Sequence, residues 1–276
     1  MIPKGKLLII GGHEAKGDEG IGTLIVEKRT SAISHFEILG QLIQHIPRLH
    51  HIIEIIASAS EIPKEMEDMY VNAYKNEGFT HVGIIKVENS KDANNIELIK
   101  RIQSAHAVFF TGGDQEKLLT IFKDSTMLHA VKTKYNNDEH FIVSGTSAGA
   151  MVMGQLSITG GLIGSTLLKG DIQITQGFGM LDNVLIDTHF IKRGRFPRLA
   201  HAVLLNPTCL GIGIEEDTAL IISGGTDVTC IGSGMVLLIN GKHITHSNVK
   251  TADEKTPIVA DNLRVNILAQ GSNFQL

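Results

Sequence analysis

The chain has 276 residues, of which 42% are hydrophobic and 20% are charged, and its formal net charge is −4 with histidine neutral. This length is sufficient for a large domain to bury a core without metal or disulfide support. The negative charge argues against a general nucleic-acid binder, because neutralising phosphates requires a basic face. No repeat, low-complexity tract or linker divides the sequence, so we expect a single α/β domain over residues 1–276.

The cysteines and the amino-terminal segment argue against other classes. Cys209 and Cys230 form neither a metal-binding spacing nor a disulfide framework, which predicts small core residues and a reducing, cytoplasmic environment. The apolar run at residues 7–10 is too short for a signal peptide or a membrane span. No H-E-x-x-H or C-x-x-C motif indicates a metal site. We therefore expect no membrane and no metal as partners.

Strand and helix patterns alternate through the first part of the chain. Residues 6–10 are an apolar run that ends at Gly11-Gly12, which is typical of a strand buried on both faces of a parallel sheet. The alternation predicts a mostly parallel sheet sandwiched by helices. The further strands are expected at 52–57, 80–87 and 107–111, and the helices at 31–45, 63–76, 93–104 and, after Gly112-Gly113, up to about residue 123.

Residues 141–153 form an apolar run that is interrupted by the motif Gly145-Thr-Ser-Ala-Gly149. A glycine two places before and after Ser147 predicts a sharp turn between a strand and a helix, with the hydroxyl at the carboxyl edge of the sheet. The following helix would direct free N–H groups and the positive end of its dipole toward the same place. Ser147 is therefore a candidate nucleophile. The alternative is a tight turn in which the serine only caps a helix.

The remainder of the chain predicts short strands and one helix. Glycine-rich loops are expected at 160–170 and 176–179, and Asn240-Gly241 is a type I′ hairpin signal. We expect the last strands to form antiparallel edge structure of the same domain. The strands are predicted at 184–187, 210–214, 219–223, 228–232 and 235–239, and the helix at 197–205, where Pro197 fits the first turn.

A serine hydroxyl is a poor nucleophile unless a base lies within hydrogen-bond reach and a third group orients that base. Among thirteen histidines, His189 is the best candidate because it directly follows an apolar strand. The other histidines fit surface or core positions. Three acids that follow residue 214 compete for the orienting role, and the sequence leaves the choice among them open: Glu215, Glu216 and Asp217.

Two further features point to substrate chemistry. The double glycine after residue 111 would free backbone N–H groups, so Gly113 and Ala148 could form a two-donor oxyanion hole, although a plain strand-to-helix turn explains the glycines equally well. Arg193, Arg195 and Arg198 closely follow the candidate base. Arginine recognises carboxylates with two hydrogen bonds, which predicts an anionic ligand; phosphate ligands or a solvated helix start would also fit.

Five motifs in this order resemble those of the cyanophycinases, in the serine peptidase family that also contains dipeptidase E. The resemblance spans nearly the whole chain. The motifs are Gly11-Gly-His-Glu14, Gly112-Gly-Asp-Gln115, Gly145-Thr-Ser-Ala-Gly-Ala150, Asp187-Thr-His-Phe190 with the three arginines, and Gly211-Ile-Gly-Ile-Glu-Glu-Asp-Thr-Ala219.

The resemblance implies a role for each matching residue. Ser147 would be the nucleophile, His189 the base and Glu216 the orienting acid. It also implies a fold like that of class I glutamine amidotransferases and, frequently, a homodimer. We expect that the serine mechanism requires no metal or organic cofactor. The implied substrate is cyanophycin, a polyaspartate that bears arginine on its β-carboxyl groups and is cleaved to β-aspartyl-arginine dipeptides. The substrate pocket would be lined by Gln115, Asp187, Arg193, Arg195 and Arg198.

The chain departs from the family pattern at two positions. Thr188 stands where the pattern has glutamine, and Asp114 stands where it has asparagine. The first change removes an amide and the second adds a negative charge. Three functions therefore stay open at this stage: a serine exopeptidase for cyanophycin or related β-aspartyl peptides, a dipeptidase E-like enzyme for α-aspartyl dipeptides, and a non-catalytic binder of acidic or phosphorylated ligands.

Overall fold

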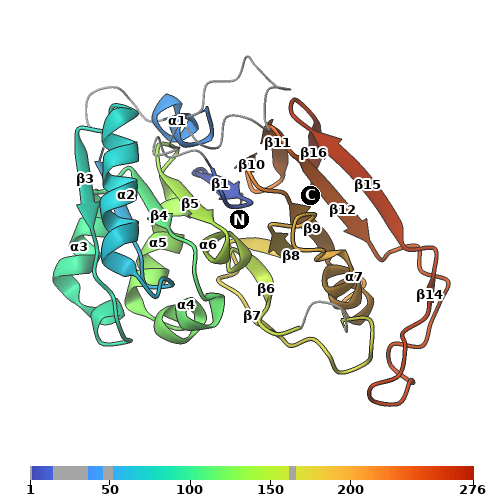
Figure 1. Cartoon of the computed structure of the whole chain (residues 1–276). Helices are drawn as coiled ribbons and strands as arrows, with labels where there is room; N and C mark the ends of the chain where they lie inside the picture. Colours follow the sequence, from blue (N-terminus) through green and yellow to red (C-terminus); the bar gives the residue numbers. More distant parts are fainter. Residues whose placement is uncertain (1, 15–36, 46–51, 162–165) are drawn as a thin grey trace, which may run out of the picture.

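Two β-sheets carry the fold, and helices pack against both of them (Figure 1). The computed structural model describes residues 2–14, 37–45, 52–161 and 166–276. The amino-terminal part of the helix predicted at 31–45 lies outside these residues, and its described part is α1 (Glu37–Gln44).

The larger sheet has eight strands in the order β16-β11-β10-β1-β5-β4-β2-β3. Five neighbouring strands run parallel, in the order β1, β5, β4, β2 and β3. The strands β10, β11 and β16 are antiparallel additions at one edge. Their bounds are β1 (Lys6–Ile10), β2 (Ile52–Ile56), β3 (His81–Ile84), β4 (Ala107–Phe110), β5 (Ile142–Thr146), β10 (Thr218–Ser223), β11 (Asp227–Gly232) and β16 (Asn273–Gln275).

The smaller sheet has six strands in the order β15-β12-β9-β8-β6-β7, with β6, β8 and β9 parallel. A two-stranded ribbon of β13 and β14 lies in the connection between β12 and β15. The bounds are β6 (Gly154–Ile158), β7 (Ile174–Gln176), β8 (Leu181–Thr188), β9 (Leu210–Ile214), β12 (Met235–Asn240), β13 (His246–Ser247), β14 (Ala260–Asp261) and β15 (Arg264–Ala269).

Alternating side chains of the strands enter different hydrophobic layers. On β1, Leu8 and Ile10 pack with residues of α1 and α2 on one face of the larger sheet. Leu7 and Ile9 belong to the central layer, which also contains apolar residues of the smaller sheet. The outer face of the smaller sheet packs on α7. The remaining helices are α2 (Pro63–Asn76), the 3₁₀ helix η1 (Asp92–Asn94), α3 (Ile96–Ser104), α4 (Gln115–Phe122), α5 (Thr126–Asn137), α6 (Ala148–Met151) and α7 (Phe196–Leu205).

The predicted fold class is confirmed, including the antiparallel carboxyl-terminal strands. The chain, however, distributes its strands over two sheets, and α5 was not predicted. The prediction of a type I′ hairpin at Asn240-Gly241 was wrong. The Asn240 side chain accepts a hydrogen bond from the N–H of Lys242 at 2.9 Å, which makes a local Asx turn, and β12 pairs instead with the distant β15.

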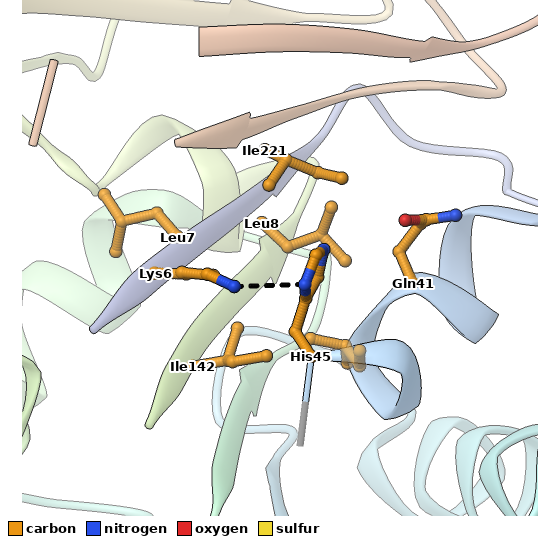
Figure 2. A pocket seen from close by; sticks show the side chains of 8 residues that line it. Lys6, Leu7, Leu8, Gln41, His45, Ile142 and Ile221 are labelled. Atoms are coloured by element: carbon orange, nitrogen blue, oxygen red, sulfur yellow. Dashed lines mark hydrogen bonds between the residues drawn. The ribbon is translucent and has the colours of Figure 1, made fainter. Parts of the chain in front are cut away.

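The two cysteines are buried, as expected for core residues. In the described parts of the chain, no helix is long and apolar enough to cross a membrane. At the amino ends of β1 and β5, Lys6 Nζ lies 3.0 Å from His45 Nδ1 beside a cavity of about 10 Å³ (Figure 2). That volume holds about one water molecule, so this cavity is too small for a substrate.

Candidate active site

The carboxyl ends of β1, β5, β8 and β9 meet between the two sheets. Ser147 follows β5, and its N–H donates to the Ile10 carbonyl at 3.0 Å. His189 follows β8, and its N–H donates to the Gly11 carbonyl at 2.9 Å. Glu216 follows β9. The end of β1 thus holds the loops of both sheets together, which is why residues far apart in the sequence become neighbours.

Ser147 occupies the predicted bend. Its φ of 51° and ψ of −115° are unusual for a residue with a side chain, and such backbone strain costs about 1–3 kcal/mol. A Cβ atom on Gly149 would come within 2.2 Å of the Phe110 carbonyl oxygen, so the bend requires a glycine there. The helix after the bend, α6, has only four residues, and its dipole is smaller than that of the longer helix expected from the sequence.

His189 links the serine to an acid. Its Nε2 atom lies 2.9 Å from Ser147 Oγ, and its Nδ1 atom lies 2.7 Å from Glu216 Oε1. The imidazole is buried, with a residue exposure of 5%, and it lies directly over Gly12, where an added Cβ would be 2.4 Å from His189 Cε1. The glycine at position 12 therefore makes room for the ring.

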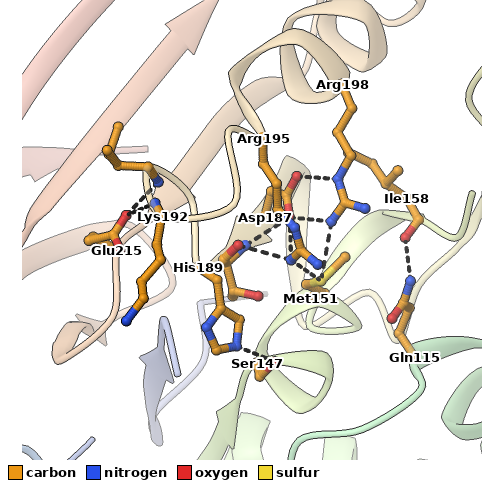
Figure 3. Close-up of polar contacts among 12 residues, drawn as sticks. Gln115, Ser147, Met151, Ile158, Asp187, His189, Lys192, Arg195, Arg198 and Glu215 are labelled. Carbon is orange, nitrogen blue, oxygen red and sulfur yellow. Dashed lines mark hydrogen bonds and ion pairs between the residues drawn. The ribbon is translucent and has the colours of Figure 1, made fainter. Parts of the chain in front are cut away.

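The acids that follow β9 have different partners. Glu216 binds the imidazole through Oε1, and its Oε2 atom lies 2.9 Å from Lys192 Nζ. Glu215 accepts hydrogen bonds from the backbone N–H groups of Ile191 and Lys192, and so fixes the turn after His189 (Figure 3). Asp217 accepts a hydrogen bond from the Ser233 hydroxyl. Of the candidates left open by the sequence, the structure places Glu216 at the imidazole.

The surroundings keep the imidazole neutral and the acid ionised. Burial lowers the pKa of His189, and the charges of Arg193 and Arg195 add to this, while Glu216 opposes it. Burial alone would raise the pKa of Glu216, but hydrogen bonds from His189 and Lys192 outweigh burial and lower it. A neutral imidazole can accept a proton from Ser147, and an ionised carboxylate stabilises the imidazolium that results.

Of the two predicted oxyanion donors, Ala148 directly follows the serine, and Gly113 belongs to a turn whose preceding residue contacts the serine. Ala148 is the first residue of α6, where an N–H group has no partner within the helix. A Cβ on Gly112 would lie 3.3 Å from Ser147 Cβ, so the 112–113 turn packs against the nucleophile. Gly113 has a φ of 138°, which favours glycine. The Asp114 carboxylate accepts a hydrogen bond from the N–H of Glu116 at 2.8 Å and so caps α4.

The predicted substrate-binding residues divide into buried and exposed groups. Asp187 is fully buried and accepts hydrogen bonds from Arg198 Nε at 2.6 Å and from Arg195 Nη1 at 3.2 Å (Figure 3). Burial lowers the pKa of Arg195 to about 10, although the charge of Asp187 raises it. The guanidinium of Arg195 therefore stays charged at neutral pH. Arg193 is exposed. Asp187 thus contacts arginines, and Arg193 is the member of the group that faces solvent.

The last predicted residue, Gln115, is half-buried at the start of α4. Its amide Nε2 donates to the Ile158 carbonyl at 3.1 Å, on the side of Ser147 opposite to Glu215 (Figure 3). Thr188, which replaces the expected glutamine, is fully buried, and its hydroxyl makes no hydrogen bond to the described residues. Thr188 therefore presents no polar group to a substrate in this arrangement.

Two parts of the site were missed from the sequence. Lys192 was passed over in favour of the neighbouring arginines, although its position three residues after His189 places it within one turn of the base. Glu14 is buried and accepts hydrogen bonds from the Tyr70 hydroxyl and from Thr146 Oγ1, the latter at 2.7 Å. It therefore holds the residue that precedes the nucleophile. The available signal was that Glu14 follows the first glycine pair by two residues, at the end of a predicted strand.

No group of three or more histidine, cysteine, aspartate or glutamate side chains could hold a metal ion within the part of the chain that the structure describes. The side chains at the strand ends instead form a hydrogen-bonded relay from hydroxyl to imidazole to carboxylate. The same relay recurs on unrelated folds among serine hydrolases.

Comparison with known proteins defines the class. The chain is a serine-type peptidase, and it belongs to peptidase family S51, whose model matches residues 37–230. It is 28% identical over 264 residues to a cyanophycinase from Synechococcus elongatus, covering 96% of this chain and 81% of the relative. It is 31% identical over 224 residues to a cyanophycinase from Trichormus variabilis, covering 81% of this chain and 75% of the relative.

A solved structure shares the fold. The crystal structure of a peptidase from an acI-B1 Actinobacterium matches with a TM-score of 0.69 at 21% identity, and the match covers 100% of this chain and 98% of the other. At this level of identity the likeness concerns the fold alone.

Proposed function

We propose that the protein is a serine exopeptidase that hydrolyses cyanophycin or related β-aspartyl peptides and releases β-aspartyl-arginine dipeptides. The observation that carries the proposal is the continuous relay from Ser147 Oγ through His189 to Glu216, with distances of 2.9 Å and 2.7 Å. The cyanophycinase relatives and the cationic side chains beside the base support the choice of substrate.

The reaction proceeds in two stages. Ser147 Oγ attacks the carbonyl carbon of the scissile bond while its proton passes to His189 Nε2, and Glu216 stabilises the imidazolium through Nδ1. The N–H groups of Gly113 and Ala148 stabilise the oxyanion. The leaving amine takes the proton from Nε2 as the C–N bond breaks. A water molecule, deprotonated by the same imidazole, then attacks the acyl enzyme, and the serine leaves with the proton.

The cationic residues select the acidic substrate. Arg193 is exposed and free to bind a substrate carboxylate, whereas Arg195 and Arg198 are positioned by Asp187 at the back of the site. Gln115 lines the opposite side and binds the substrate with the polar atoms that its contact with Ile158 leaves available. The enzyme acts in the cytoplasm, as the cysteine content predicts, and it forms a homodimer, as the resemblance implies. Size-exclusion chromatography with light scattering tests the homodimer.

A second candidate is a dipeptidase E-like enzyme for α-aspartyl dipeptides. Thr188 favours it, because a fully buried threonine without a hydrogen-bond partner among the described residues cannot replace an amide that would bind an aspartyl backbone. A non-catalytic binder of acidic ligands is the third.

One assay separates these candidates. The protein is incubated with insoluble cyanophycin and with a panel of aspartyl dipeptides, and the products are identified by mass, with Ser147→Ala as the control. Release of β-aspartyl-arginine by the wild type alone supports the proposal. Cleavage restricted to α-aspartyl dipeptides favours the second candidate. Absence of any cleavage by folded protein favours the binder, and full activity of Ser147→Ala contradicts the serine mechanism.

A further inference from the structure

A cavity of 370 Å³ lies at the carboxyl ends of β2 and β3, beside the first turn of α2. Its floor includes the buried residues Ser58 and Val87, which are joined by a hydrogen bond from the serine hydroxyl to the valine carbonyl at 2.5 Å. We call this cavity the distal pocket. Six charged side chains line it: Lys64, Lys86, Lys117, Glu61, Glu67 and Glu88.

The charges in the distal pocket are not paired with one another. Within the described parts of the chain none of the six forms an ion pair, although several other surface lysines and acids do. Lys117 Nζ donates a hydrogen bond to the Ser60 carbonyl, at 3.3 Å. The pocket therefore presents three cations and three carboxylates that are available to a ligand.

The distal pocket lies along the same edge of the larger sheet as the candidate active site. The larger sheet has the local order β5-β4-β2-β3, and its carboxyl edge runs from Ser147 across Gly113 to the pocket. The contact between β4 and β2 is close, because the Asp114 N–H donates to the Ala59 carbonyl at 2.9 Å, one residue from Ser60 in the pocket lining. Neighbouring strands are about 4.8 Å apart, so β2 and β3 lie about 10 and 14 Å from β5.

This spacing matches an extended chain. An extended peptide advances about 3.3–3.6 Å per residue, so a backbone that crosses the edge from the nucleophile enters the distal pocket about three to four residues from the scissile bond. A soluble dipeptide bound at Ser147 ends before it. The pocket can therefore distinguish a polymer from its smallest fragments.

We propose that the distal pocket is a second substrate subsite, which binds a repeat unit of the polymer a few residues away from the bond that is cleaved. The inference rests on the proposed function. Each unit of the polymer carries one carboxylate and one guanidinium, so the lysines bind the carboxylates and the glutamates bind the guanidinium groups. A purely anionic ligand would meet three carboxylates, and a purely cationic ligand would meet three lysines. A zwitterionic ligand satisfies both sets.

The test compares binding of the polymer with cleavage of a short substrate. The double variant Lys64→Gln/Lys86→Gln removes two positive charges from the pocket. The double variant Glu61→Gln/Glu67→Gln removes two negative charges. Lys75→Gln/Lys250→Gln is the matched control, since both of its lysines are exposed outside the pocket. Each pair of substitutions is placed in Ser147→Ala protein, and the dissociation constant for insoluble cyanophycin is measured by co-sedimentation. The same pairs in active protein are assayed on a soluble dimer of β-aspartyl-arginine.

We expect both pocket variants to bind the polymer about tenfold more weakly than the control, which corresponds to the loss of about 1.4 kcal/mol. Cleavage of the soluble dimer should stay within about twofold of the control. Polymer binding equal to that of the control in both pocket variants would overturn the subsite. So would an equal loss on the dimer, because the pocket would then act on the site as a whole.

The two proposals can fail separately. If active wild-type protein leaves the polymer intact while Ser147→Ala protein binds it through the lysines and glutamates of the pocket, then the proposed function is wrong and the subsite is supported. If the polymer is cleaved but the pocket variants bind it normally, then the subsite is wrong and the function is supported. Thermal unfolding of each variant shows that it is folded.

Discussion

Replacement of Gly12 by alanine should displace the base without removing any catalytic group. The added Cβ would lie 2.4 Å from His189 Cε1 and 2.5 Å from Nε2, whereas van der Waals contact begins near 3.4 Å. The ring must therefore move by about 1 Å, because His189 is packed over the glycine at the end of β1. That movement lengthens the hydrogen bond of 2.9 Å between His189 Nε2 and Ser147 Oγ beyond its useful range.

The size of the effect follows from this displacement. A misplacement of about 1 Å in a catalytic group costs roughly 10²-fold in rate. The φ of Gly12 is 104°, and forcing alanine to adopt it destabilises the fold by about 1–3 kcal/mol. The loss of activity should thus be much larger than the loss of folded protein.

Gly271→Ala is the matched control. This glycine also has a positive φ, 82°, but an added Cβ would meet no atom within 4 Å. It should lose stability to a similar extent and keep its kcat. The assay is kcat/KM on a soluble aspartyl peptide, with unfolding by urea measured in parallel. Wild-type kcat/KM in folded Gly12→Ala protein would show that the imidazole does not act from its position over residue 12.

Two further substitutions test the electrostatics of the site. The positive charge of Arg193 contributes to the lowered pKa of His189, so Arg193→Gln should raise that pKa and shift the acidic limb of the kcat/KM profile to higher pH. The control Arg264→Gln changes an exposed arginine and should leave the profile unchanged. An unshifted limb in Arg193→Gln would refute this reasoning. Asp187→Asn leaves Arg195 and Arg198 without their buried counter-ion, so the free energy of unfolding measured in urea should fall by about 3–5 kcal/mol. The control Asp261→Asn changes an exposed carboxylate and should alter the free energy of unfolding by less than about 0.5 kcal/mol. Equal stability of the two variants would contradict the pairing of Asp187 with the arginines.

The first half of the fold was predictable because its local signals agree with its tertiary structure. The helix predicted at 63–76 has these bounds as α2, where Pro63 starts the helix and Tyr70 and Tyr74 pack on the larger sheet. The helix α5 was missed, although Ser125 caps it through the Leu128 N–H at 3.1 Å. Its apolar and polar residues are weakly segregated, so hydrophobic periodicity gave little signal there.

The division into two sheets could not be predicted from the sequence. The strands β8 and β9 are apolar runs like β1 and β5, and periodicity predicts a strand without specifying its neighbours. Pairing depends on contacts between residues far apart in the chain. The hairpin signal at Asn240-Gly241 failed for the same reason, since β12 finds its partners in β9 and β15.

The part of the site that lies directly at strand ends was predictable from the sequence. Ser147 and His189 could be chosen because each follows an apolar strand whose end faces the ligand edge of a parallel sheet. The choice of Glu216 over Glu215 depends on the loop after His189, whose N–H groups engage Glu215. The pairing of Asp187 with two arginines is a buried contact, and charge counting along the sequence cannot reveal it.

Reaction with a fluorophosphonate tests the central claim most directly, because this reagent phosphonylates a serine, with loss of fluoride, only where a base and oxyanion donors activate it. The measurement is the site and rate of labelling, determined by peptide mass spectrometry. We expect labelling at Ser147 in the wild type, slowed by at least about 10³-fold in His189→Gln. Folded wild-type protein that stays unlabelled over long incubation, or that reacts equally fast without His189, would contradict the relay of Ser147, His189 and Glu216.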